Sequence, residues 1–259
     1  MKGKVWATIS ETSVLAEGIC SMWIEERQMA TEAVPGQFIS VYCRDKSKLL
    51  PRPISICEID KREGKLRIVY RIAGAGTLEF SKMQAGEKIE VMGPLGNGYD
   101  LRDMDRTRSA ILIGGGIGIP PLVALAKALP GEKTAVLGYR DSQTFLKKEF
   151  EDCGCKVVIA TDDGSIGTKG NVIDAMKAIG LRGNMIFSCG PTPMQRGVKA
   201  YAEEMQIPAQ LSLEERMACG IGACLACVCK TKEVDEHSQV HNRRVCKDGP
   251  VFRANDIEL

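Results

Sequence analysis

Four cysteines near the C-terminus have a spacing that could hold iron. Cys219, Cys224 and Cys227 form a Cys-x4-Cys-x2-Cys run, and Cys246 follows after the insert at residues 228–245. Three thiolates on one tight loop with a distant fourth are typical of plant-type 2Fe–2S clusters. The residues between the first three ligands are mostly small, so the backbone could wrap around such a group. The spacing therefore predicts a 2Fe–2S cluster, which transfers one electron at a time.

A structural zinc site with four cysteine ligands is the main alternative for this segment. Zinc sites more often use two Cys-x2-Cys pairs, whereas here the first pair is Cys-x4-Cys and the fourth ligand stands alone. A zinc-binding scaffold would be a colourless, non-catalytic protein, so this alternative belongs to a different functional class. Cys229 is a rival ligand, but only one residue separates it from Cys227, and we interpret it as a bystander.

A glycine-rich turn in the middle of the chain could bind a dinucleotide. Residues 111–121, ILIGGGIGIPP, run from an apolar strand through Gly114, Gly115, Gly116 and Gly118 into a helix that begins with proline. Glycines let the backbone approach a pyrophosphate, and the N-terminus of the following helix supplies amide donors. A later turn, residues 188–194 (SCGPTPM), repeats the strand-to-helix arrangement. The two turns together predict a nucleotide site.

The elements that position these motifs fall into three segments. Residues 1–102 contain short apolar runs between Gly, Pro or charged turns, which favours a β-barrel or sandwich. Residues 103–212 alternate between strand and helix, which is typical of an α/β domain with a doubly wound parallel sheet. Residues 213–259 carry the four cysteines and are expected to form a small cluster domain.

Individual elements are predicted with less precise ends. In the first segment we expect one strand over Val14–Ile24 and one short helix over Leu78–Lys82. In the second segment the helices are expected at Pro121–Ala128, Ser142–Asp152, Val172–Ile179 and Met194–Met205.

The composition argues against several functional classes. Lys and Arg number 35 and Asp and Glu number 33, so the net charge of +2 gives no large field for nucleic acid or an anionic membrane. The uncharged stretch Ala110–Ala126 contains glycines and prolines and is too short for a spanning helix. We therefore expect a cytoplasmic protein that binds neither nucleic acid nor membrane.

The order of these motifs is similar to that of the ferredoxin-NADP reductase superfamily. A β-barrel precedes Gly-Gly-x-Gly-x-x-Pro, and a Cys-Gly-Pro-x-Pro-Met turn with Cys189 and Gly190 follows. The resemblance implies FAD on the barrel and a nicotinamide dinucleotide on the second domain. The Arg-x-Tyr-Ser flavin motif of that superfamily is matched, with isoleucine in place of tyrosine, by Arg52, Pro53, Ile54 and Ser55. Arg52 would then pair with the FAD pyrophosphate, and Ser55 would lie near flavin N5.

The same resemblance implies a second flavin element and a nucleotide preference. The second element consists of Val69, Tyr70, Arg71, Gly76 and Thr77. In the superfamily the adenosine 2′-phosphate of NADP is met just after the third strand of the nucleotide domain. Here the residues at that place are TDDG (161–164), and Asp162 would accept a hydrogen bond from a ribose hydroxyl but repel a phosphate. NAD is therefore expected over NADP, unless the aspartates merely form a turn.

The resemblance narrows when longer segments are considered. Residues 52–55, residues 93–98 (GPLGNG), residues 215–224 (ERMACGIGAC) and residues 246–252 (CKDGPVF) resemble the electron-transfer subunits of bacterial B-type dihydroorotate dehydrogenases. That family implies FAD, NAD, a 2Fe–2S cluster held by the four cysteines, and a catalytic partner that carries FMN. The insert from Lys232 to Arg244 is an expected point of divergence.

The resemblance implies an electron relay in pyrimidine biosynthesis. Electrons would pass from the partner's FMN through the cluster and FAD to NAD, and the assembly would be a heterotetramer with two copies of each subunit. No acid–base residue is expected in this chain, because hydride transfer between FAD and NAD needs none. Leu225, beside the cluster ligands, would either contact the partner or pack locally. The alternative is a related subunit that serves another partner, such as a sulfide or ferredoxin oxidoreductase.

Overall fold

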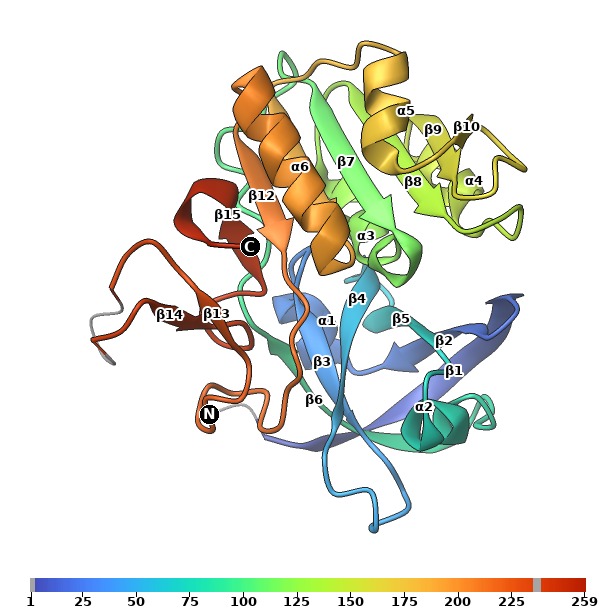
Figure 1. Ribbon diagram of the computed structural model, residues 1–259. Helices are drawn as coiled ribbons and strands as arrows, with labels where there is room; N and C mark the ends of the chain where they lie inside the picture. Colours follow the sequence, from blue (N-terminus) through green and yellow to red (C-terminus); the bar gives the residue numbers. More distant parts are fainter. Residues whose placement is uncertain (1–2, 235–238) are drawn as a thin grey trace.

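Six antiparallel strands close into a barrel in the N-terminal part of the chain (Figure 1). The computed structural model describes residues 3–234 and 239–259. The strands are β1 (Val5–Ala16), β2 (Ile19–Glu25), β3 (Phe38–Tyr42), β4 (Arg52–Asp60), β5 (Lys65–Arg71) and β6 (Lys88–Leu95), and the helices are α1 (Arg27–Glu32) and α2 (Ala75–Phe80). The strand order is β1-β2-β5-β4-β3-β6, and closure leaves the sheet without an open edge.

The first hairpin differs from the single strand predicted over Val14–Ile24. The chain turns at Glu17 and Gly18, so β1 ends at Ala16 and β2 runs back along it. Gly18 has φ +69°, a left-handed conformation that glycine adopts without steric cost. The apolar residues on both sides of this turn made the two strands look like one continuous run.

Helix α2 begins at Ala75, three residues earlier than predicted. The Thr77 hydroxyl accepts the backbone amides of Ala73 at 2.9 Å and Gly74 at 3.3 Å. These bonds satisfy amides that precede the helix, and they draw the first turn back toward Gly74.

The second sheet has seven strands and is parallel except at one edge. Its strands are β7 (Ala110–Gly115), β8 (Lys133–Tyr139), β9 (Cys155–Thr161), β10 (Thr168–Lys169), β11 (Met185–Cys189), β12 (Ala209–Ser212) and β15 (Val251–Arg253), in the order β10-β9-β8-β7-β11-β12-β15. The antiparallel edge strand β15 comes from the C-terminal segment and pairs with β12. The third predicted segment therefore contributes a strand to the sheet of the second.

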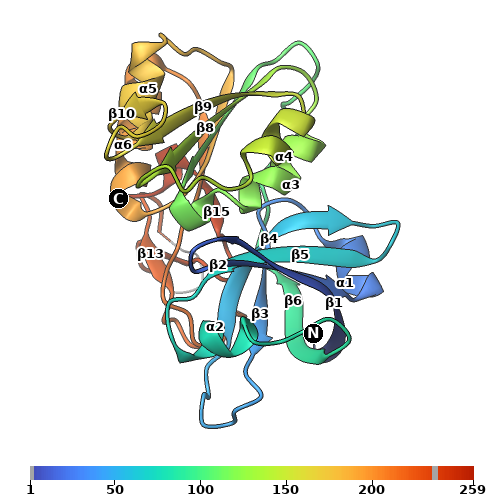
Figure 2. The same ribbon diagram turned by 90° about the vertical axis from the view of Figure 1, so that its right-hand side faces the viewer.

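Helices cover both faces of this sheet. They are α3 (Pro121–Ala128), α4 (Lys147–Asp152), α5 (Val172–Ala178) and α6 (Thr192–Met205). Helices α3 and α4 share one apolar core with the sheet, whereas α5 and α6 belong to a core on the other face (Figure 2). This arrangement confirms the predicted barrel-plus-doubly-wound architecture. Helix α4 starts later than predicted because Leu146, just before it, is left-handed with φ 63°.

The cysteine-bearing segment lies against the barrel and includes a small hairpin of β13 (Val228–Lys230) and β14 (Asn242–Arg244) (Figure 1). Its buried Cys227, Val245 and Cys246 share an apolar core with Phe38 and Leu95 of the barrel. Residues 235–238 of the predicted insert lie outside the described residues. Among the helices of the described chain, none combines the length and apolarity needed to cross a bilayer.

Candidate cofactor sites

The cysteine loop directs backbone amides at its own sulfurs. Gly222 N–H donates to Cys246 Sγ at 3.1 Å, and Ala223 N–H donates to Cys219 Sγ at 3.3 Å. The amide of Cys246 donates to Cys227 Sγ at 3.4 Å. Donors of this kind favour thiolates over thiols, and thiolates are the form that binds metal. The loop therefore has the donor set that a negatively charged metal–sulfur group requires.

The four thiols differ in exposure. Cys227 and Cys246 are buried, Cys219 is half-buried, and Cys224 is exposed. Burial opposes ionisation of Cys219, but the Ile221 amide and other donors outweigh it and lower its pKa to about 6. Burial raises the pKa of the Cys246 thiol, which also lies against Cys227. Metal binding at Cys246 would release the proton of this thiol.

The thiols lie in two pairs rather than around one point. Cys219 is within hydrogen-bonding reach of Cys224, and Cys246 is within reach of Cys227. In residues 3–234 and 239–259, no three His, Cys, Asp or Glu side chains converge on a position for a single metal ion. One tetrahedral zinc needs four convergent ligands, whereas two irons can each take one pair. The arrangement fits a two-iron cluster better than zinc.

Cys229 lies on β13 and is buried in the same apolar core that contains Cys227 and Cys246. It is buried, and burial raises its pKa to about 11. Its role as a bystander stays a prediction, but its place on a paired strand gives it a structural use.

Residues of the barrel contact both the cysteine loop and the turn after Cys246. Gly220 follows the first ligand with φ +70°, and a methyl group added there would lie 2.8 Å from Ser40 Oγ and 3.6 Å from Leu95 Cδ1. The Asn97 side chain donates to the carbonyls of Lys247 at 3.2 Å and Asp248 at 3.1 Å. The loop and the fourth-ligand turn therefore both rest on barrel residues.

Arg244 and Asp248, which lie on either side of Cys246 in the sequence, form an ion pair next to this predicted fourth ligand. The Arg244 guanidinium donates through Nε to Asp248 Oδ2 at 3.0 Å and through Nη2 to Oδ1 at 3.2 Å. The Arg244 amide also donates to this carboxylate at 2.8 Å. Arg244 Nη1 lies 3.4 Å from the carbonyl oxygen of Gly222 in the cysteine loop. These bonds join the turn at Cys246 to the loop that carries the other ligands.

Arg52 and Gly76, two of the residues that the sequence assigned to FAD, are in contact at the N-terminal end of α2. A methyl group added at Gly76 would lie 2.3 Å from Arg52 Nε and 2.7 Å from Arg52 Cζ. The Arg52 guanidinium therefore lies directly against the glycine, and Nη1 donates to the carbonyl of Leu50. This places a planar cation beside the first turn of a helix, which suits a phosphate.

The other residues of the predicted flavin motifs divide between surface and core. Ile54 and Tyr70 are buried in the barrel core, where the Tyr70 ring packs edge-on against Phe80 at 6.2 Å. Val69 is buried between the barrel and α3. These three can offer a flavin little beyond their backbone. Pro53 is exposed and Ser55 is half-exposed, so this strand presents its other face to a ligand.

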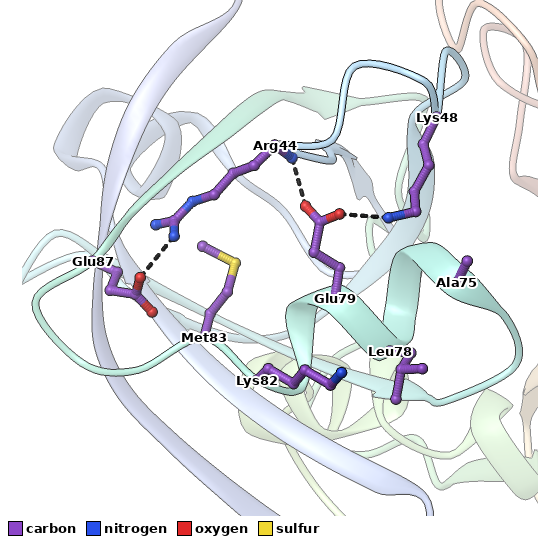
Figure 3. A pocket seen from close by; sticks show the side chains of 8 residues that line it. All are labelled: Arg44, Lys48, Ala75, Leu78, Glu79, Lys82, Met83 and Glu87. Carbon is purple, nitrogen blue, oxygen red and sulfur yellow. Dashed lines mark hydrogen bonds and ion pairs between the residues drawn. The ribbon is translucent and has the colours of Figure 1, made fainter.

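A cavity of about 420 Å³ adjoins the start of α2 (Figure 3). It is lined by Arg44, Lys48, Ala75, Leu78, Glu79, Lys82, Met83 and Glu87. Arg44 pairs with Glu87 at 2.7 Å, and Lys48 pairs with Glu79 at 2.8 Å. The cavity lies next to Gly76 and has largely neutralised walls.

The glycine turn after β7 and the turn after β11 are in contact at the carboxyl ends of these two neighbouring parallel strands. Cys189 at the end of β11 is in register with Gly114 at the end of β7. A methyl group at Gly118 would lie 2.3 Å from the Cys189 carbonyl oxygen and 2.6 Å from Gly190 Cα. The strand order reverses between β7 and β11, and ligands of doubly wound sheets bind at such a reversal.

Gly115 and Gly116 complete this turn and connect it to the barrel. A methyl group at Gly115 would lie 2.6 Å from Met194 Sδ, and one at Gly116 would lie 3.4 Å from Arg71 Nη2. Arg71 is exposed at the end of β5 and therefore reaches across to the nucleotide domain. The positive charge of Arg71 therefore lies between the predicted FAD site and the predicted NAD site.

The two aspartates after β9 have different environments. Asp163 accepts hydrogen bonds from the Ser165 hydroxyl at 2.7 Å and the Ser165 amide at 2.9 Å, and these bonds lower its pKa. Asp162 is exposed, and among the described residues no hydrogen bond to its carboxylate is found. Asp163 thus forms the turn, and Asp162 is left available for a ligand.

Sequence reasoning assigned no role to Ser40 or Asn97. Asn97 belongs to the GPLGNG segment, whose glycines were interpreted as turn formers. The sequence did contain a signal for Asn97: glycines alone can form such a turn, so a carboxamide side chain among them indicates a further hydrogen-bonding role.

The fold and the paired sites define a flavin- and nicotinamide-dependent reductase with an appended iron–sulfur domain. The structure of an NADH-dependent reduced ferredoxin-NADP oxidoreductase is similar over 100% of this chain and 91% of that chain, with a TM-score of 0.86 and 30% identity. Phthalate dioxygenase reductase has the same fold over 94% of each chain, with a TM-score of 0.63 and 16% identity.

Curated relatives are more similar still. Residues 214–258 match the iron-sulfur cluster binding domain of dihydroorotate dehydrogenase B. The electron transfer subunit of dihydroorotate dehydrogenase B (NAD(+)) from Fusobacterium nucleatum is 42% identical over 97% of both chains. The corresponding subunit from Geobacillus kaustophilus is 41% identical over 100% of both. The chain belongs to this family of electron transfer subunits.

Proposed function

We propose that this chain is the NAD-linked electron transfer subunit of a dihydroorotate dehydrogenase in pyrimidine biosynthesis. The observation that carries the proposal is that the cysteine loop and the flavin motif share one barrel wall. Ser40 on β3 lies against Gly220 of the loop and is paired with Pro53 of the motif. A cluster exchanges single electrons and FAD exchanges two electrons with nicotinamide as hydride, so their adjacency lets one protein join the two kinds of chemistry.

The barrel residues bind and orient FAD. Arg52 lies beside Gly76 and would pair with the pyrophosphate, and Thr77 holds the first turn of α2 in place through its bonds to Ala73 and Gly74. Ser55 lies on the outward side of β4, where it would contact the flavin. The cavity along α2, which Ala75 lines, would offer room for the nucleoside half of FAD.

The nucleotide domain binds NAD at the reversal of the sheet. Gly114, Gly115, Gly116 and Gly118 would let the backbone approach the pyrophosphate, and Cys189 and Gly190 lie against Gly118, where they would contact the dinucleotide. Asp162 selects the unphosphorylated ribose. Hydride transfer between FAD and NAD needs no acid–base residue, but electrons that arrive from the cluster carry no proton, so flavin N5 would take one proton from solvent before it donates hydride.

The cluster is held by Cys219, Cys224, Cys227 and Cys246. Cys224 and Leu225 are exposed, so electrons can enter through this face from a catalytic partner that carries FMN. The assembly is a cytoplasmic heterotetramer with two copies of each subunit.

The central test is the content and behaviour of the purified subunit. We expect one FAD, two irons and two acid-labile sulfides per chain, and NADH oxidation with artificial dyes. Dihydroorotate should be oxidised only after an FMN-loaded partner is added. Zinc without sulfide would contradict the cluster, and dihydroorotate turnover by the isolated subunit would contradict the relay.

The second candidate is a subunit of another reductase, and the similarity to the ferredoxin-NADP oxidoreductase structure is the observation in its favour. Its identity of 30% is lower than the 41–42% of the dihydroorotate dehydrogenase relatives. Failure of an FMN-loaded dihydroorotate dehydrogenase partner to increase NAD reduction would favour this candidate.

A further inference from the structure

Ser40 occupies an unusual place on the outer face of the barrel. Its strand neighbours Ile39 and Val41 point into the barrel core. Phe38 and Tyr42 point outward and pack against the core of the cysteine-bearing segment. Because side chains alternate along a strand, Ser40 also points outward, between these two aromatic rings. It is only 1% exposed.

Ser40 lies between the predicted cluster site and the predicted FAD site, with a neighbour in each. A methyl group at Gly220, the residue after Cys219, would lie 2.8 Å from Ser40 Oγ. Along the sheet Ser40 is paired with Pro53 of the flavin motif on β4. The hydroxyl therefore lies under the cysteine loop and one strand away from the motif assigned to FAD.

The Ser40 hydroxyl has no hydrogen-bond partner in the described part of the chain. A buried hydroxyl without a partner is destabilising, and alanine would pack equally well in an apolar contact. Backbone amides already donate to the sulfurs of Cys219, Cys227 and Cys246. An additional donor that faces this loop from the barrel side thus has a sulfur-rich acceptor once iron and sulfide are present.

We propose that Ser40 is a positioning residue whose hydroxyl donates a hydrogen bond to a sulfur of the bound cluster and makes the cluster easier to reduce. This inference rests on the proposed function. Reduction adds one negative charge to the cluster, so a donor stabilises the reduced form more than the oxidised form. The hydroxyl keeps its proton and only changes the energy at which the electron is accepted.

The test compares Ser40→Ala and Ser40→Cys with the unaltered subunit, each purified with FAD and cluster. EPR-monitored titration should show the alanine midpoint shifted to more negative potential. One hydrogen bond of ordinary net strength corresponds to about a fivefold change in the reduction equilibrium, or about 40 mV at about 59 mV per tenfold change. The cysteine variant, with a weaker donor of similar size, should lie between the two. The FAD midpoint should not move.

Deuterium exchange supplies a readout that packing alone would not change. In deuterated buffer, the pulsed-EPR deuteron coupling from the hydroxyl should be lost in Ser40→Ala. Ser188→Ala is the matched control, because Ser188 is also fully buried and unpartnered in the described chain but lies in the other sheet. It should leave the cluster midpoint unchanged.

Three outcomes would overturn the inference. An intact cluster with unchanged midpoint and coupling in Ser40→Ala would show that the hydroxyl only fills space, and the proposed function would stand. If the alanine variant fails to fold, an unchanged midpoint in Ser40→Cys would lead to the same conclusion. Absence of any 2Fe–2S signal in the unaltered subunit would remove the proposed function and this inference together.

Discussion

Asn97 and Asp248 are 151 residues apart in sequence yet are joined by a hydrogen bond of 3.1 Å from the Asn97 carboxamide to the Asp248 backbone carbonyl. The same carboxamide reaches the Lys247 carbonyl, and the Asn97 amide donates to the Gly249 carbonyl at 2.6 Å. The end of the barrel thus holds the turn that follows Cys246. Cys246, the predicted fourth ligand, is therefore held in place by a residue that follows the last strand of the barrel.

Replacing Asn97 with alanine should therefore weaken cluster retention. The variant loses two hydrogen bonds to the turn, each worth about 1 kcal/mol, and Cys246 becomes less well placed. We expect faster loss of iron and sulfide during incubation with a chelator, followed by visible absorption, with FAD content unchanged. Asn255→Ala, at an exposed position, is the control. Equal cluster lifetimes in the two variants would show that the turn holds itself, through Arg244 and Asp248.

Adding one methyl group at Gly76 should impair FAD binding. The new Cβ would lie 2.3 Å from Arg52 Nε, so the guanidinium must leave its place beside α2. Gly74→Ala is the matched control, because no heavy atom lies within 4 Å of a methyl group there and its φ of −180° suits any residue. FAD fluorescence titration should show at least tenfold weaker binding for Gly76→Ala only. Similar affinities for both variants would remove Arg52 from the pyrophosphate site.

The pairing of the thiols predicts that substitution of Cys224 and substitution of Cys229 have different effects on the cluster. Cys224→Ser should abolish the cluster and leave FAD bound, because Cys224 completes one pair and is not among the residues assigned to FAD. Cys229→Ala should keep both, at a modest cost in stability from the lost core packing. Iron and sulfide analysis with flavin absorbance distinguishes the two variants. Loss of the cluster in Cys229→Ala would make this cysteine a ligand.

Substitution of Asp162 should relax the preference for NADH. Two unit charges ~4 Å apart interact by ~4 kcal/mol at an effective dielectric constant of ~20, and solvent screening at this exposed site reduces that value. Asp162→Ser should raise kcat/KM for NADPH relative to NADH by about tenfold. Asp163→Ser should disturb the turn held by Ser165 and affect both cofactors equally. An unchanged ratio in Asp162→Ser would show that Asp162 does not contact the ribose.

A buried ion-pair network joins the barrel to the nucleotide domain. Arg67 Nη1 lies 2.7 Å from Glu58 Oε1 and 3.5 Å from Glu149 Oε1 of α4, and Lys127 of α3 also binds Glu58. Arg67→Met should lower stability by about 3 kcal/mol, because it leaves Glu58 buried with only Lys127. Urea unfolding measures the loss, and Arg62→Met, at an exposed site, is the control. Equal midpoints for the two variants would mean that the network contributes nothing.

The sequence by itself determined the cofactor classes and the three-part architecture. Ligand spacing within a loop and hydrophobic periodicity are local properties, so Cys219, Cys224 and Cys227, the glycine turn at 114–118 and the α/β alternation could be recognised without coordinates. Helix α3 has the predicted bounds because Pro121 marks its first turn and the apolar run ends at Ala128.

Tertiary structure decided which residues surround those cofactors. Ile54 occupies the expected flavin motif, yet the inward face of β4 places it in the barrel core. Ser40, Asn97 and the edge strand β15 acquire their roles from partners far away in sequence. A motif describes only its own segment. Barrel closure and the return of the C-terminus to the sheet bring distant residues together, because burying apolar surface favours those long-range contacts.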